Sequence, residues 1–159
     1  YNPIVIVLNT KVTVNEKLID IRAVSHPVRL LADCHTHTLF PQPLATPASM
    51  LPKSIIDSLK NKTLLDFGVT IKSETFVFNK KFCTIPSPLV IAYALAIGAS
   101  GKASRIFLAG FDGYGADDKR TYEMDKLFSI FQRTKGSPSL IAITNTNYKL
   151  KISSVYSLL

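Results

Sequence analysis

Tryptophan is absent from this sequence of 159 residues, and cysteine and methionine occur only twice each. Cys34 and Cys83 are too few and too far apart to form a disulfide framework or a zinc site of the CxxC type. We therefore expect two reduced thiols in a cytoplasmic protein. A catalytic or structural role for either cysteine is not indicated by its spacing.

Charged residues are also scarce, at 19%, whereas hydrophobic residues make up 47% of the chain. Such a composition excludes a disordered protein, which combines low hydrophobicity with high charge. The longest apolar run, Leu89 to Gly98, is shorter than the ~18 residues that a membrane span requires, so we expect no membrane association. No leader pattern is visible after Tyr1, and a first residue other than Met leads us to expect a part of a longer protein. Residues 1–159 have the length of a single domain.

Acidic residues number only 11 against 19 lysines and arginines, which gives a net charge of +8. A basic domain can bind nucleic acid, but such domains gather their charges on one face. Here the lysines are scattered, and the only two adjacent ones are Lys80 and Lys81. We therefore expect no nucleic-acid partner, and at most a site for phosphate or an acidic sugar.

Short apolar runs rich in β-branched residues alternate with helical patterns along the chain, which predicts an α/β fold. Strands are expected at Ile4–Leu8, Ile21–Val24, Leu44–Thr46, Leu64–Ile71, Thr75–Phe78, Arg105–Leu108 and Leu140–Thr144, and the chain is expected to end in an extended segment, 149–155. Helices are expected at Val28–Ala32, Pro52–Leu59, Leu89–Ala99 and Tyr122–Arg133. Because helices of this kind cover both faces of a parallel sheet, we predict a three-layer, Rossmann-like domain with a mostly parallel sheet.

Ligands of open α/β sheets bind beyond the carboxyl ends of the strands, and this rule selects four segments. Asn9 and Thr10 follow the first strand, and the amide of Asn9 could hold a ribose or a base edge or simply cap a turn. His26 follows the second strand and could face a phosphate. Ser87 precedes the apolar helix, where it could cap the helix, with Pro88 in the first turn, or bind phosphate.

The fourth segment, Gly110 to Gly115, is the most distinctive run of the sequence. Its glycines permit left-handed backbone and a close approach of a ligand. Asp112 could accept hydrogen bonds from ribose or sugar hydroxyls, and Gly110 and Tyr114 flank it. A tight, solvated turn is the alternative interpretation.

Metal and catalytic motifs are not evident. His35 and His37 form an HxH pair, but His26 is the only other histidine, and a catalytic metal takes three protein ligands. No nucleophile elbow, P-loop or Ser/His/Asp arrangement is visible. We therefore expect neither a metal site nor a catalytic residue in this domain.

Several segments resemble a known family. They are SPLVIAYALAIGASGKASRIFLAGFDGYGADDKRTYEM, NPIVIVLNTK, AVSHPVRLLAD and the closing YKLKISSVYSLL. Together they resemble the C-terminal domain of bacterial proteins similar to 4-hydroxy-2-oxovalerate aldolase and HMG-CoA lyase, which often occur in surface-polysaccharide clusters. The resemblance implies that an N-terminal TIM barrel, absent from this sequence, is the partner of the domain and carries the divalent metal.

A more distant similarity connects the same residues with CMP-sialic-acid-dependent sialyltransferases and MptE-like pterin diphosphokinases. Asn9, Ser87 and Asp112 match the places that surround the nucleotide in the sialyltransferases. The Gly-rich first strand and turn of those families would precede Tyr1, which predicts either a sheet without its first strand or an unusual strand order. Their catalytic histidine follows the Asp motif, whereas here no histidine follows His37.

These observations lead to one preferred function and two alternatives. The preferred function is an accessory or regulatory domain of an aldolase-like lyase that binds a nucleotide, nucleotide-sugar or other phosphorylated ligand. The ligand would contact Asn9, Thr10, His26, Ser87, Gly110, Asp112 and Tyr114. One alternative is a sialyltransferase-like glycosyltransferase domain. The other is a module that docks or oligomerises the TIM barrel, with a homo-oligomer as one form.

Overall fold

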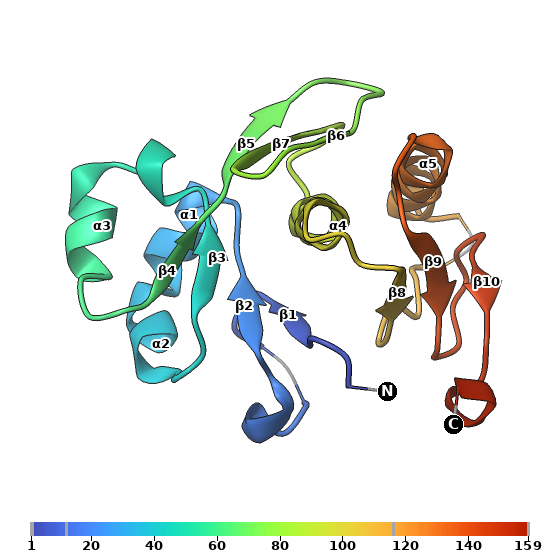
Figure 1. Cartoon of the computed structure of the whole chain (residues 1–159), viewed down its shortest axis with the longest axis horizontal. Helices are drawn as coiled ribbons and strands as arrows, with labels where there is room; N and C mark the ends of the chain where they lie inside the picture. The colour runs from blue at the N-terminus through green and yellow to red at the C-terminus, as the bar shows by residue number, and fades with distance from the viewer. Residues whose placement is uncertain (1, 12, 116, 159) are drawn as a thin grey trace.

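A computed structural model describes residues 2–11, 13–115 and 117–158 of the chain. Its strands and helices alternate except over residues 27–39, where two helices follow one another, and over 64–85 and 139–152, where strands do, and the fold is α/β with mostly parallel sheets, consistent with a Rossmann-like domain (Figure 1). The strands are β1 (Ile6–Leu8), β2 (Ile21–Ala23), β3 (Leu44–Thr46), β4 (Leu64–Asp66), β5 (Gly68–Ile71), β6 (Val77–Phe78), β7 (Phe82–Ile85), β8 (Arg105–Leu108), β9 (Ser139–Ala142) and β10 (Lys151–Ile152). The helices are α1 (Pro27–Ala32), α2 (Cys34–Leu39), α3 (Lys53–Ser58), α4 (Val90–Ser100) and α5 (Lys119–Arg133), with short 3-10 helices η1 (Glu16–Leu18), η2 (Ala48–Met50) and η3 (Val155–Leu158).

The described strands form three sheets. Sheet A has the order β1-β2-β3-β4 and sheet C the order β10-β9-β8, and every pair in both is parallel. Sheet B has the order β5-β7-β6, in which β6 is antiparallel to β7. The prediction of a mostly parallel arrangement is therefore confirmed, but the strands are divided among three sheets.

Helices cover both faces of sheet A, as continuous apolar strands require. On one face, Leu30 of α1 and Ile55 of α3 pack with Val24 and Leu44 in a small cluster. On the other face lies α4, which contacts β1 and β2 and is also covered by β6 and β7 of sheet B. Figure 1 shows α4 between sheet B and sheet A, with α1–α3 on the far side of sheet A. These are the three layers that the alternating pattern predicts.

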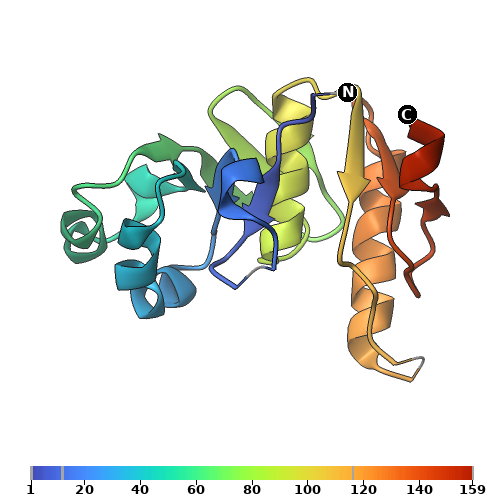
Figure 2. The ribbon, with the colours of Figure 1, turned by 90° about the horizontal axis from the view of Figure 1, so that it is seen from below.

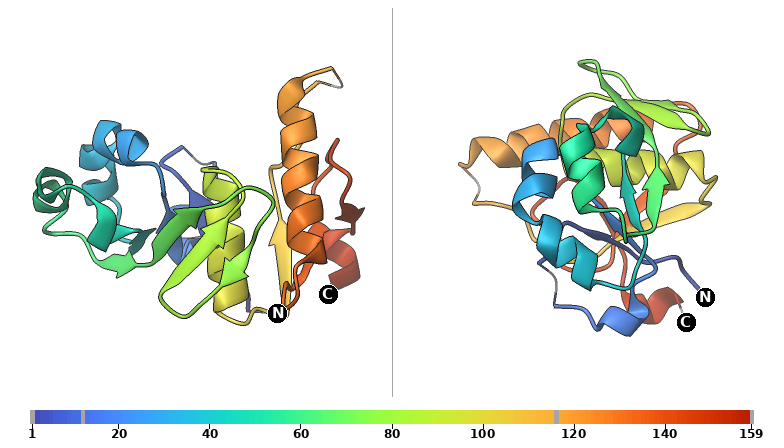
Figure 3. Two further views of the ribbon diagram at one scale, coloured as in Figure 1. Left: turned by 90° about the horizontal axis from the view of Figure 1, so that it is seen from above. Right: turned by 90° about the vertical axis from the view of Figure 1, so that its left-hand side faces the viewer.

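The second and larger core joins α4, sheet B, α5 and sheet C. Phe131 of α5 contacts the rings of Phe76 and Phe78 edge-on, with centroids 5.3 Å and 5.8 Å away. On the same helix, Phe128 contacts the ring of Tyr148, which lies in the segment between β9 and β10 of sheet C. Figure 3 shows α5 alongside sheet C, at the opposite end of the molecule from α1–α3. α5 is therefore the element that ties sheets B and C together.

The single strand expected over 64–71 is two strands, because the chain passes there from sheet A to sheet B. The Phe67 N–H donates to Thr46 O at 3.1 Å, on the side of β3, and the next N–H, of Gly68, donates to Lys81 O at 2.8 Å, beside β7. A Cβ at Gly68 would lie 3.2 Å from the Phe82 Cβ. The close approach of the two strands explains why glycine stands at the crossing.

Other boundaries also differ from the sequence-based expectation. Strand β7 and helix α2 were not expected, since neither segment has a clear apolar period, and β6 is shorter than the predicted 75–78 strand. Helix α5 begins at Lys119 rather than at Tyr122, because the Asp118 carboxylate accepts from the Arg120 N–H and caps the helix earlier. Ala116, which comes directly after the predicted site segment Gly110 to Gly115, lies outside the described residues.

Candidate functional site: a cavity at the carboxyl ends of sheet A

A cavity of about 290 Å³ lies where the carboxyl ends of β2 and β3 meet sheet B and the start of α4. It is lined by Ser25, His26, Pro27, Pro47, Met50, Leu51, Val69, Ile71, Ile85 and Pro88. The place agrees with the rule for open α/β sheets. The sequence predicts a ligand site in the loop after β2, whereas the residues that η2 and sheet B add to the lining were not expected.

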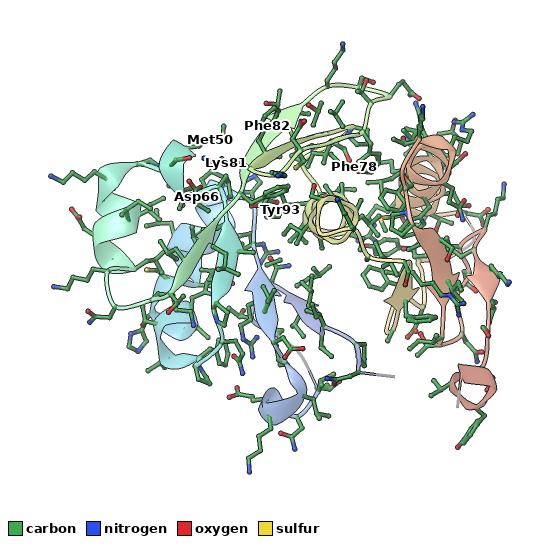
Figure 4. The ribbon with its side chains drawn as sticks, viewed as in Figure 1. Met50, Asp66, Phe78, Lys81, Phe82 and Tyr93 are labelled. Carbon is green, nitrogen blue, oxygen red and sulfur yellow. The ribbon has the colours of Figure 1, made fainter. Side chains whose placement is uncertain are left out.

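The walls of this cavity are mostly apolar. Val69 and Ile71 alternate on β5, and Ile85 of β7 is fully buried. Met50 closes the side next to sheet B, because its Sδ lies 3.4 Å from the Val69 N–H, which donates to it. Figure 4 shows Met50 near Lys81 and Phe82, at the edge of sheet B. Such a surface suits the flat face of a ring better than a charged group.

Polar groups occur at the cavity at one side only. His26 is exposed and stands at the N-cap position of α1, where its side chain makes no capping hydrogen bond. The Ser25 Oγ is buried and has no hydrogen-bond partner among the described residues. A buried hydroxyl without a partner is uncommon in folded proteins, which distinguishes Ser25 from the other residues that line the cavity.

Ser87 does not cap the helix, so this sequence-based interpretation is wrong. The cap residue of α4 is Leu89, in extended conformation and without a side-chain cap, and the helix begins at Val90. Pro88, expected in the first turn, precedes the cap and lines the cavity instead. The reason is that apolar packing of α4 against sheet B sets its position, while Ser87 stays in the half-buried approach to the helix. The first N–H groups of α4 thus have no side-chain acceptor from the cap residue.

Asn9 and Thr10 lie at the carboxyl end of β1 but do not line this cavity. Asn9 has a left-handed backbone with φ of 58°, and its N–H donates to Ala23 O at 3.0 Å. The Thr10 hydroxyl donates to the Asp33 carboxylate at 3.2 Å, which ties the loop to the junction of α1 and α2. Asn9 therefore forms the turn that was the alternative interpretation, and its half-buried side chain stays a predicted ligand contact.

Gly110, Asp112 and Tyr114 form a second group, around the polar segment after β9. The Gly110 N–H donates to the Thr144 hydroxyl at 3.0 Å, and the Asp112 carbonyl accepts from the Asn147 N–H at 2.8 Å. The Tyr114 carbonyl accepts from the Asn147 side-chain amide. These bonds hold the glycine-rich loop against the carboxyl end of sheet C, with the side chain of Asp112 exposed.

A second, wider hollow of about 620 Å³ borders this loop at the start of α5. It is lined by Asp117, Asp118, Lys119, Thr121, Tyr122, Asp125, Asn147 and Lys149. The pKa of Asp118 is lowered to about 2 because Arg120 donates side-chain and backbone hydrogen bonds to its carboxylate. The guanidinium of Arg120 also lies 3.9 Å from the centre of the Tyr114 ring. Asp118 therefore forms an ion pair with Arg120 and also caps the start of α5.

The predicted site residues are thus distributed over separate places at the carboxyl side of the molecule. His26 lines the first cavity and Ser87 adjoins it through Pro88, whereas Gly110, Asp112 and Tyr114 belong with Asn147. Figure 2 shows the arrows of β1 and β8 pointing the same way, so both loops emerge on the same side. No common cavity among those described joins Asn9, Ser87 and Asp112.

Two groups of residues at these sites were not found from the sequence. Met50, Leu51, Val69 and Ile71 carry no polar signal, and only the crossing of β5 into sheet B brings them together. Thr144 and Asn147 could have been found, because the run TNTN begins two residues after the end of the buried strand β9. The rule that selected Asn9 applies to that position as well.

The HxH pair lies on α2, where residues two apart point to different sides of a helix. His35 is exposed, whereas His37 is fully buried, and neither of its ring nitrogens has a hydrogen-bond partner among the described residues. In the described part of the chain, no three His, Cys, Asp or Glu side chains gather as metal ligands. Both cysteines are free thiols, and burial raises the pKa of Cys83 to about 12, which makes that thiol unreactive.

A buried polar cluster, not expected from the sequence, lies at the opposite, amino ends of β2 and β3. Arg22 is fully buried, donates from Nε to Gln42 Oε1 at 3.0 Å and stacks 3.5 Å above the Phe40 ring. Its Nη2 lies 3.8 Å from the Glu16 carboxylate, and Lys62 donates to Phe40 O. Burial lowers the pKa of Arg22, and the carboxylate of Glu16 opposes that shift. The cluster fastens the segments that enter β2 and β3.

Comparison with known proteins adds no family to this geometry. The chain matches no protein-family model, no curated protein and no solved structure. No helix within residues 2–11, 13–115 and 117–158 has the length and apolarity to cross a bilayer. The function is therefore inferred from the site itself.

Proposed function

We propose that the domain binds a nucleotide, nucleotide-sugar or related phosphorylated ligand at the carboxyl ends of sheet A. The observation that carries this proposal is the cavity between β2, β3 and sheet B, with apolar walls and polar groups on one side. Small-molecule sites commonly combine such walls with a few convergent polar groups. The net charge of +8 favours an anionic ligand.

The chemistry of the cavity suggests how the ligand is oriented. A planar base would lie against Val69 and Ile71, where it replaces water on an apolar surface. The volume of about 290 Å³ is at the lower end for small-molecule sites, so a base with part of its ribose fills it. Ser25 Oγ would accept or donate one hydrogen bond to the base or ribose, and His26 would face the more polar part.

The phosphates would then lie toward Ser87 and the start of α4. This helix has eleven residues, and its first N–H groups have no side-chain acceptor from the cap residue. Free N–H groups and the helix dipole favour a negative charge there. Asp112 and Tyr114 would be reached only by a further group of the ligand, such as the sugar.

Isothermal titration calorimetry with CMP-, UDP- and GDP-sugars, and with inorganic phosphate alone, tests this function. Val69→Phe fills the cavity from β5 and is expected to weaken nucleotide binding at least ten-fold. Val77→Phe is the matched control, because it makes the same change on an exposed residue of sheet B that does not line the cavity. Absence of binding to every nucleotide by the folded protein would contradict the proposal, as would equal loss in both variants.

The role in a longer protein is also a proposal, and it rests on the resemblance to aldolase-associated C-terminal domains. In that setting the domain would bind its ligand next to a TIM barrel that carries out the lyase chemistry. Sedimentation of the domain alone and mixed with such a barrel tests the association. A monomer without affinity for the barrel contradicts it and leaves the ligand site as an independent question.

A glycosyltransferase is the second candidate, and the position of His26 at the cavity favours it. His26 is the one histidine of the chain that lines this cavity, so it is the residue placed to act as a general base on an acceptor hydroxyl. Product formation from a nucleotide-sugar that is lost in His26→Ala would support this activity. Binding without turnover would leave the accessory function as the better description.

A further inference from the structure

Two edge strands lie on either side of the centre of the molecule. β1 is the end strand of sheet A and β8 is the end strand of sheet C. Figure 2 shows them pointing the same way, with α4 beside both. In a doubly wound fold, the strands in the centre are normally paired on both sides, so two edges at this place need an explanation.

The hydrogen bonds define which backbone groups form these edges. In β1, the Asn9 N–H donates to Ala23 O and Val5 O accepts from the Ile21 N–H, so the odd-numbered residues face β2. The N–H and C=O groups of Ile6 and Leu8 therefore point away from sheet A, because strand residues alternate in direction. These groups have no partner among the described strands.

The same argument applies to β8. Leu108 O accepts from the Ile143 N–H, so Leu108 and Ile106 face β9 and the backbone groups of Phe107 face the opposite edge. Phe107, like Ile6 and Leu8, is only half-buried, although all three are apolar residues of strands in the middle of the fold. Both edges thus expose apolar side chains together with unpaired backbone groups.

Helix α4 fixes how far apart these edges can be. It contacts β1, and Leu8 packs against its core cluster. It also touches β8, since a Cβ at Gly98 would lie 2.9 Å from the Ile106 Cδ1. A helix is about 10 Å wide, which equals two strand spacings of about 4.8 Å. β1 and β8 both contact this helix and are not paired with each other, so their separation is more than one strand spacing and is limited by the width of the helix, which gives room for one added strand.

We propose that one extended, apolar segment of polypeptide binds between β1 and β8, parallel to both, and completes the order β4-β3-β2-β1-strand-β8-β9-β10. Only a single strand satisfies both edges, because the sheet edge of a second copy could pair with β1 or with β8 but not with both. Residues of the added strand that face α4 must be apolar, since Leu8 and Ile106 continue that surface. This inference concerns the space between the edges of β1 and β8, and it does not depend on the proposed ligand.

A peptide tethered to the full chain tests whether an extended segment binds between β1 and β8. The peptide Lys-Thr-Ile-Val-Val-Ile-Thr-Lys is fused to the N-terminus through about 15 Gly and Ser residues, which span about 21 Å, close to the ~20 Å length of a six-residue strand. The tether keeps the peptide at an effective concentration of about 1 mM. Amide hydrogen exchange, followed by NMR, is expected to slow at least ten-fold at Ile6, Leu8 and Phe107 relative to the unfused chain.

The control fusion carries proline in place of both valines of the peptide and is expected to give no slowing, because proline lacks the donor. The proposal is overturned if slowing is confined to one edge or is equal in both fusions. It is also overturned if these amides in the unfused chain already exchange as slowly as that of Val7, since the two strands would then be closed on each other. Slowing that grows with protein concentration, together with a dimer in sedimentation, would assign the edges to a second copy instead.

Discussion

At the scale of single residues, buried polar groups distinguish this core from a purely apolar one. Tyr93 of α4 is fully buried, yet its hydroxyl reaches the carbonyl of Phe67 at the crossing between sheets A and B. Burial raises the pKa of Tyr93, so this hydroxyl is a permanent donor. His37 is equally buried but has no hydrogen-bond partner among the described residues. We therefore expect stability to depend on the Tyr93 hydroxyl at any pH, and on His37 only toward acid pH.

Tyr93→Phe is expected to lower the free energy of unfolding by about 1–3 kcal/mol, because the buried Phe67 carbonyl loses its donor. Urea denaturation followed by circular dichroism measures the change. Tyr156→Phe is the control, since Tyr156 is 87% exposed and its loss should leave stability within about 0.5 kcal/mol. Equal effects of the two substitutions would show that the hydroxyl of Tyr93 contributes nothing specific.

His37 predicts a loss of stability toward acid. Burial is the main cause that lowers its pKa from the ordinary 6.5; Lys62 and Arg22 lower it further, and Asp33 opposes them. The unfolded chain therefore takes up a proton at a pH where the folded chain does not, so stability falls as pH drops below about 6.5. Above that pH, His37 is neutral in both the folded and the unfolded chain, so this loss of stability is absent.

The measurement is the midpoint of urea denaturation at pH 7.5 and at pH 5.5. His37→Gln should reduce the difference between the two values, whereas His35→Gln, on the exposed side of α2, should leave it unchanged. A difference that is the same in His37→Gln and in the unaltered protein would assign the acid sensitivity to other groups.

At the scale of elements, loops and helix starts are positioned by packing as much as by local sequence. The start of α4 is an example, since its apolar surface places Val90 and not the Ser87–Pro88 pair at the beginning of the helix. The glycine-rich loop shows the opposite case. Gly110 and Gly113 have φ of 72° and 98°, and only glycine adopts such values without strain.

Alanine substitutions in this loop should therefore form a graded series. Gly115→Ala is expected to be nearly neutral, because its backbone is not left-handed and nothing lies within 4 Å of the added Cβ. Gly110→Ala should cost about 1–2 kcal/mol from backbone strain alone. Gly113→Ala should cost more, since its Cβ would lie 2.9 Å from the Asn147 Cβ. Thermal unfolding of the three variants gives the order, and any other order would contradict this geometry.

At the scale of the whole molecule, two cores of different size hold the layers together. The smaller core lies between α1, α3 and sheet A, and the larger one joins α4, α5 and sheets B and C. Phe131 is central to the larger core, because it is fully buried on α5 and touches two aromatic rings next to sheet B. Its contacts link segments far apart in the sequence.

Phe131→Ala is expected to lower the free energy of unfolding by about 3–5 kcal/mol, through lost burial and the cavity left behind. Phe82→Ala removes the same ring from the surface of sheet B, where it is 49% exposed, and should cost clearly less. Urea denaturation of both variants provides the test. Similar losses would mean that α5 does not hold sheets B and C together.

Much of the fold was predictable, because a buried parallel strand reads as a short apolar run and a covering helix as a periodic one. Ile6–Leu8, Arg105–Leu108 and α5 were found in this way. Strand β7 was not, since Phe82–Ile85 alternates between buried and less buried residues over only four positions. Of the candidate site, only the place of His26 at the cavity was predictable, because polar residues after a buried strand carry a clear signal.

The sequence by itself determined most of the elements and the direction of most strands, since these follow from local pattern and from the short connections between neighbours. Only the tertiary structure decided that Phe67 and Gly68 lead the chain from one sheet into another, and hence that Met50, Val69 and Ile85 enclose a cavity. It also decided that β1 and β8 remain edges. Such features arise from packing between segments that are distant in the sequence, and this packing produces no local periodic pattern from which it could be predicted.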